Sequence, residues 1–192
     1  MKYPCIGFLT AFFLAAIVTC TSFSLGNQGK KHGDTRDIEA QVSFELSVPI
    51  GWQWDEQALA EAIPRAEIHP KASMHLSSHT VIYVIIQATS MSDTSDLESL
   101  VFEDVNSMIQ GLPGLAVKAR SPLTTGGGRA AVVRDIYGDS SYQAIAYVKE
   151  EHALVKIIGF TQTKAELNRI ARAFRSVVRS FSTFKTISKF QD

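Results

Sequence analysis

Three histidines and a glutamate gather in one short stretch of the chain. His69, His75 and His79 fall within eleven residues, and Glu67 lies beside them. Imidazole and carboxylate groups are ligands of zinc and other transition ions. On an extended chain, however, His75 and His79 share a face about 13 Å apart, too far to hold one ion unless the chain turns between them. The stretch is therefore a candidate metal site, and a set of solvated loop histidines is the alternative.

A run of three glycines is the second group that could do chemistry. Gly126, Gly127 and Gly128 precede Arg129, and such a segment can form a nest of backbone N–H groups that binds an anion. No P-loop lysine and serine follow, and the next residues have the pattern of a strand rather than a helix. We therefore interpret the glycines as a hairpin turn.

Recognisable catalytic motifs are absent from the sequence. The chain has no Gly-x-Ser-x-Gly motif, and no Ser-His-Asp grouping can be identified. Both cysteines, Cys5 and Cys20, lie in the first twenty residues, so the rest of the chain has no thiolate nucleophile, disulfide or zinc–thiolate site. We expect a non-enzymatic protein without a cofactor, and a hydrolase is the alternative.

Two groups of side chains are candidates for binding a partner. Arg172, Arg175 and Arg179 recur at helical spacing and would lie together on the outer side of a helix. They could form an ordinary solvated surface or a docking surface for an acidic protein or anionic headgroups. Trp52 and Trp54 lie two residues apart, on one side of an extended chain. They could close one end of the core or contribute to the partner site.

Charge is balanced over the whole chain but not along it. Lysine plus arginine and aspartate plus glutamate number 19 each, which argues against a dedicated nucleic-acid binder. Residues 27–160 carry 11 basic and 17 acidic side chains, whereas residues 161–192 carry 7 and 2. The C-terminal part is therefore the part suited to an acidic partner.

The N-terminus has the pattern of an export signal. Lys2 is followed by an apolar run from Cys5 to Val18, which is long enough for a signal peptide and short for a membrane span. We predict a signal peptide over residues 1–26. The alternatives are a lipoprotein acylated at Cys20 and an uncleaved anchor. Residues 27–40 are polar and glycine-containing and are predicted to be a flexible linker. The protein is thus expected in the periplasm or outside the cell, either free or anchored as a lipoprotein.

The remaining chain predicts an α+β fold. An amphipathic helix is expected over residues 163–181, where Thr163 and Glu166 form a capping box. A second helix is expected over residues 92–111, with Ser95 and Glu98 at its cap. The expected strands cover residues 41–48, 79–88, 115–121, 130–137, 141–149 and 153–160. Short connections between the later strands favour an antiparallel sheet of about six strands. Residues 55–68 have no clear pattern and could form a short helical turn or a loop.

Three segments together resemble a known superfamily. They are the strand and turn over residues 44–52, the segment Gly127-Gly128-Arg129-Ala130, and the helix ending Ser176-Val177-Val178-Arg179-Ser180-Phe181. In this order they resemble the PsbP/Mog-like superfamily, over a domain of residues 41–183 followed by a basic tail of residues 184–192. The resemblance implies an antiparallel sheet sandwiched by helices, with no enzymatic activity and a role in binding or stabilising other proteins.

These expectations define two functions. The first is an exported accessory or binding protein that docks on a partner protein or envelope complex. Its partner would have an acidic surface or belong to a membrane-associated complex, and nucleic acid is not expected. The alternative is a carrier whose small apolar or anionic ligand lies between the sheet and a helix.

Overall fold

The computed structural model describes residues 42–55, 65–88, 96–150 and 153–185. The predicted signal peptide, Cys20 and the predicted linker lie outside these residues. The elements in chain order are β1 (Val42–Glu45), β2 (Trp52–Asp55), β3 (Arg65–Pro70), a 3-10 turn η2 (Ala72–Met74), β4 (Val81–Ala88), α1 (Leu97–Gly111), β5 (Ala116–Ala119), β6 (Leu123–Thr124), β7 (Ala130–Tyr137), β8 (Tyr142–Lys149), β9 (Ala153–Thr161), α2 (Lys164–Ser180) and β10 (Ser182–Lys185).

Eight of the described strands form one antiparallel sheet, in the order β2-β3-β4-β9-β8-β7-β5, with β6 also paired to β7. The predicted α+β class and antiparallel sheet are confirmed, but the expected number of about six strands is too low. Segment 115–121 forms only the four residues of β5, and β6 follows as a separate strand. The predicted strand over residues 130–137 is β7 without change.

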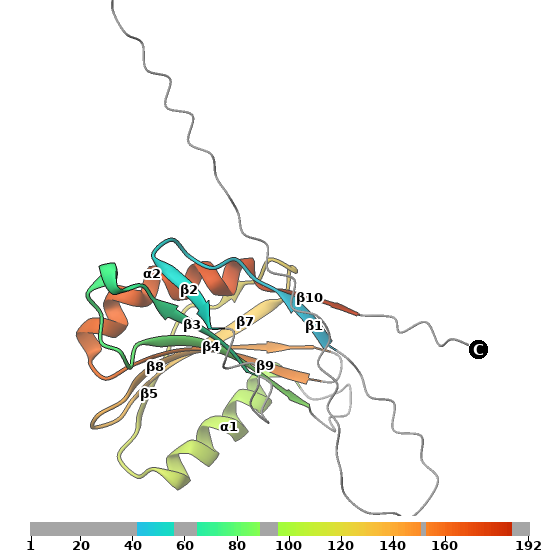
Figure 1. The fold of residues 1–192 in the computed structure, drawn as a ribbon. Helices are drawn as coiled ribbons and strands as arrows, with labels where there is room; N and C mark the ends of the chain where they lie inside the picture. The colour runs from blue at the N-terminus through green and yellow to red at the C-terminus, as the bar shows by residue number, and fades with distance from the viewer. Residues whose placement is uncertain (1–41, 56–64, 89–95, 151–152, 186–192) are drawn as a thin grey trace, which may run out of the picture.

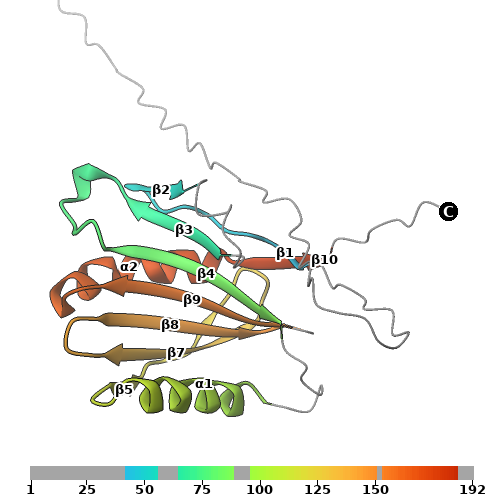
Figure 2. The ribbon, with the colours of Figure 1, turned by 60° about the horizontal axis from the view of Figure 1, so that its bottom comes forward.

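The sheet lies between the two helices (Figures 1 and 2). Alternate residues of each strand point to opposite faces, so each face has its own core. On one face, Leu167, Ile170 and Phe174 of α2 pack against apolar residues of the sheet such as Ile68 and Ile82. On the other face, α1 contacts β7 and β8 at one side of the sheet. No helix in the described segments is long and apolar enough to cross a membrane.

The predicted capping box begins α2. The backbone N–H of Glu166 donates to Thr163 Oγ1 at 3.2 Å, and the Thr163 hydroxyl donates to Glu166 Oε2 at 3.3 Å. The expected cap of α1 was one residue too early: Asp96, not Ser95, caps this helix by accepting from the N–H of Ser99 at 2.7 Å. That bond is the main reason why the pKa of the Asp96 carboxyl is lowered.

Three strand pairings involve segments that sequence patterns leave unassigned. Most of β3 comes from the uncertain segment 55–68, and it pairs with β2 and β4 at one side of the sheet. The last two residues of β10 come from the predicted tail, and β10 pairs with β1 as a separate two-stranded sheet. The aromatic rings of Phe44 and Phe181 lie 5.7 Å apart beside this pair.

A buried polar cluster fastens α1 to the sheet. The Tyr147 hydroxyl donates to Asp104 Oδ2 at 2.9 Å, and Lys156 Nζ donates to Asp104 Oδ1. Burial and the neighbouring Asp104 carboxylate both raise the pKa of the Tyr147 phenol, burial most. The buried residues of α1 itself are Leu100 and Val101. The polar cluster therefore supplements a small apolar contact.

Candidate functional site

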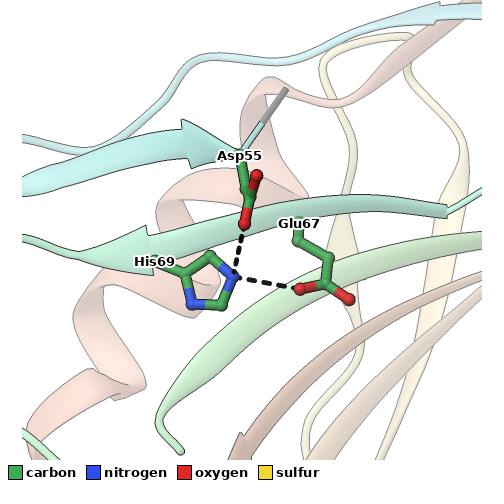
Figure 3. A group of neighbouring side chains, drawn as sticks. All are labelled: Asp55, Glu67 and His69. Atoms are coloured by element: carbon green, nitrogen blue, oxygen red, sulfur yellow. Dashed lines mark hydrogen bonds and ion pairs between the residues drawn. The ribbon is translucent and has the colours of Figure 1, made fainter. Parts of the chain in front are cut away.

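Asp55, Glu67 and His69 come together on β2 and β3 (Figure 3). Asp55 and Glu67 are directly opposite in the strand register, and His69 lies two residues beyond Glu67 on the same face. His69 Nε2 lies 3.0 Å from Glu67 Oε2 and 3.5 Å from Asp55 Oδ2. Trp54 and Ile68, which alternate with these residues, point to the opposite face and pack in the α2-side core.

Only part of the predicted histidine site is therefore assembled. His69 and Glu67 lie together, whereas the structure places His75 and His79 outside this cluster. His75 follows η2 in a left-handed conformation with φ 49°, and both side chains are exposed. Their loop is fixed to α2, because Glu166 Oε1 accepts the N–H of Ser77 at 2.8 Å. Sequence reasoning missed Asp55, which reaches the site through strand pairing.

The arginine surface lies on α2 as predicted by helical spacing. Arg172, Arg175 and Arg179 are all exposed, and within the described residues none of their guanidinium groups has an ion-pair partner. Arg169, one turn before this surface, differs from the three arginines because its guanidinium makes hydrogen bonds to the backbone. Its guanidinium donates to the carbonyls of Met74 at 3.1 Å and His75 at 3.3 Å. Arg169 therefore holds the β3–β4 connection against α2.

The two tryptophans have different environments. Trp52 is 3% exposed and belongs to the core on the α2 side, whereas Trp54 is half-buried at its margin. The turn before β2 fixes them: the N–H of Trp52 donates to Pro49 O at 3.0 Å, and Gly51 has φ +85°. This is the geometry of a type II turn, which favours glycine at its third position. Trp52 thus closes the core.

The glycine run forms a turn between β6 and β7. The N–H of Gly128 donates to Thr125 O at 3.0 Å, and the N–H of Gly127 donates to Phe181 O at 3.2 Å. Arg129 lies 3.9 Å from a Glu150 carboxylate. Two of the amides that an anion would need are therefore already engaged within the fold.

A buried ion pair lies beside this part of the sheet. Arg120 Nε donates to Asp135 Oδ2 at 2.6 Å, and the Tyr137 hydroxyl donates to the same oxygen at 2.8 Å. Burial, followed by the neighbouring carboxylate, raises the pKa of the Tyr137 phenol. Both donors are engaged by Oδ2 of Asp135, which indicates a structural role for this group.

A hollow of about 510 Å³ lies beside the first half of α1. Its walls are formed by Asp96, Glu98, Ser99, Val101, Phe102, Glu103, Val105 and Arg134. Its one guanidinium, that of Arg134, pairs with Glu98 at 2.5 Å. The carboxylates that remain make this hollow unsuited to an anionic ligand.

The chain is similar to known proteins in structure. No protein-family model and no curated protein sequence matches the chain. Among solved structures, it is similar to cyanobacterial PsbP (CyanoP) from Synechocystis sp. PCC 6803, with 13% identity, TM-score 0.49 and coverage of 93% of this chain and 99% of that one. It is also similar to the Saccharomyces cerevisiae Ran-binding protein Mog1p, with 17% identity, TM-score 0.46 and coverage of 72% and 89%.

A third similar structure is LpqN of Mycobacterium tuberculosis, described as involved in cell envelope biogenesis. Its identity is 13%, its TM-score 0.41, and the match covers 77% of this chain and 87% of that one.

Proposed function

We propose that this chain is an exported, non-enzymatic accessory protein that docks on an acidic protein surface through the outer side of α2. The observation that carries the proposal is the exposure of Arg172, Arg175 and Arg179. They lie on one side of a single helix, are exposed, and have no ion-pair partner in the described part of the chain. The opposite side of α2 is fixed in the core, so the three charges are presented on a rigid support.

The neighbouring charges strengthen this surface. Glu166 is the acidic residue of α2, and it lies in the first turn, where it caps the helix and accepts from Ser77. The arginines follow it at distances of six to thirteen residues along the helix. A helix surface with three exposed guanidinium groups attracts acidic surfaces over a distance set by the salt concentration.

The experiment is capture of binding partners from an envelope extract of the native host by the immobilised protein. We expect captured material to be released as salt rises from about 0.1 M to about 1 M, because the screening length falls from about 10 Å to about 3 Å. The double variant Arg172→Glu/Arg175→Glu should lose the same material.

The matched control is Lys71→Glu/Lys118→Glu, which changes the net charge equally at two exposed residues outside α2. It should retain the partner if the arginine surface is the site. Equal loss in both double variants, or capture that resists both high salt and the arginine substitutions, would contradict the proposal. Export is tested separately by the N-terminal residue of the mature protein: a chain that begins at Met1 contradicts it.

A further inference from the structure

The strongest unassigned group of side chains is the cluster of Asp55, Glu67 and His69. It lies on the sheet face opposite α2, so it is not part of the arginine surface. One ligand atom from each residue lies within 4.8 Å of the other two. The proposed docking of α2 on a partner therefore does not explain why these three side chains lie together.

The cluster places two carboxylates side by side. Two carboxylates directly opposite each other on paired strands repel and destabilise the pairing. Asp55 is 38% exposed and Glu67 only 13%, so water screens this repulsion incompletely. A divalent cation bound by both carboxylates would reduce this repulsion.

The geometry matches a metal ion. In a tetrahedral zinc site with bonds of about 2.0–2.1 Å, neighbouring ligand atoms lie about 3.3–3.4 Å apart. The two observed distances from His69 Nε2, 3.0 Å and 3.5 Å, lie on either side of this value. Two carboxylates and a neutral imidazole would also neutralise a divalent ion. Imidazole with carboxylate is a donor set that suits zinc.

The strands that hold the three ligands are rigid, and the cluster is open to solvent. β2 and β3 are paired through four residues, and Trp54 and Ile68 anchor their opposite faces in the core. Ligands on paired strands are held more exactly than ligands on loops. His69 is 30% exposed, so an ion can enter and keep a fourth position for water.

We propose that Asp55, Glu67 and His69 form a binding site for one divalent transition-metal ion of the zinc class. The ion binds Asp55 Oδ2, Glu67 Oε2 and His69 Nε2, and a water molecule completes the coordination. His75 and His79 do not take part. Binding ties β2 to β3 at the opposed residues Asp55 and Glu67.

The test titrates the full, folded chain with Zn²⁺ alone by calorimetry and with Co²⁺ alone by visible absorption. We expect one ion per chain and, for Co²⁺, the intense bands of a tetrahedral site. His69→Gln and Glu67→Gln should each weaken Zn²⁺ binding at least on the order of tenfold, since even outer-shell changes at metal sites cost about 10–100-fold. The control His75→Gln/His79→Gln should bind Zn²⁺ as the unmodified chain does.

A measurement on the unmodified chain covers the case in which a variant does not fold. Zn²⁺ titration followed by NMR of the imidazole nitrogens should shift one of the five histidines, His69. Absence of binding, binding unaffected by His69→Gln, or a shift confined to other histidines would overturn the proposal.

Discussion

The polar cluster under α1 gives a sharp prediction about stability. Substituting Asp104 by alanine leaves the Tyr147 hydroxyl and the Lys156 ammonium without their shared acceptor. Tyr147 is fully buried, and the Lys156 side chain is 12% exposed. An unsatisfied buried donor costs about 1–3 kcal/mol, and an unpaired buried charge about 3–5 kcal/mol. Lys156 can turn partly toward water and alanine favours a helix, so we expect the free energy of unfolding to fall by about 2–4 kcal/mol.

Urea unfolding followed by circular dichroism and tryptophan fluorescence measures this loss. The matched control is Glu103→Ala, the exposed neighbour on the same helix, which should change stability by less than about 0.5 kcal/mol. The triple variant Asp104→Leu/Lys156→Met/Tyr147→Phe removes all the polar groups together. It should regain most of the loss, because buried ion pairs are often replaced by apolar residues without a net cost. If Asp104→Ala is no more destabilising than Glu103→Ala, the cluster does not hold α1 in place.

Two further outcomes follow from the same structure. The pKa of the Tyr147 phenol is raised above the unfolded value of 10.0, so the unfolded chain loses this proton at a lower pH than the folded chain. Above pH 10 this group should therefore lower the free energy of unfolding by about 1.4 kcal/mol per pH unit. Tyr147→Phe should remove that part of the slope in urea unfolding between pH 10 and 11, and equal slopes would contradict the assignment. A Cβ on Gly159 would lie 3.2 Å from Phe174 Cδ2, so Gly159→Ala should lower the unfolding free energy by about 1–3 kcal/mol. Gly111→Ala, which meets nothing within 4 Å, is the control, and equal stability of the two variants would refute the packing argument.

Local signals explain which elements could be predicted. The capping box of Thr163 and Glu166 and the apolar spacing after it depend on neighbours three or four residues apart, so α2 was recognisable within one residue at each end. The hairpin β7–β8 is also recognisable, because two largely apolar runs are joined by the short turn at Gly138 and Asp139. These elements make their decisive contacts within one sequence window.

The pairings that escaped prediction depend on distant residues. Val42 of β1 pairs with Lys185 of β10, at the two ends of the described chain, and no local pattern marks such a partner. β2 has only four residues, too few for a periodicity to stand out. The strand character of β2 and β10 is settled by pairing, which sequence patterns do not reveal.

The same limit applies to the proposed metal site. Glu67, His69, His75 and His79 lie close together in sequence, so the sequence predicts all four as ligands of one site. The structure replaces His75 and His79 by Asp55, which pairs with Glu67 across β2 and β3. A signal existed: Asp55 alternates with Trp54, as Glu67 and His69 alternate with Ile68. Two short segments with period two, if paired, place all three ligands on one face.

The two proposed sites can be tested without disturbing each other, because the fold separates them. Arg172, Arg175 and Arg179 lie on the outer side of α2, beyond the core that α2 shares with the sheet. Asp55 and His69 project from the opposite face of the sheet. Charge reversal on α2 should therefore leave Zn²⁺ binding intact, and His69→Gln should leave capture of an acidic partner intact. If both substitutions abolished both activities, the common cause would be loss of the core between the sites, which circular dichroism would reveal.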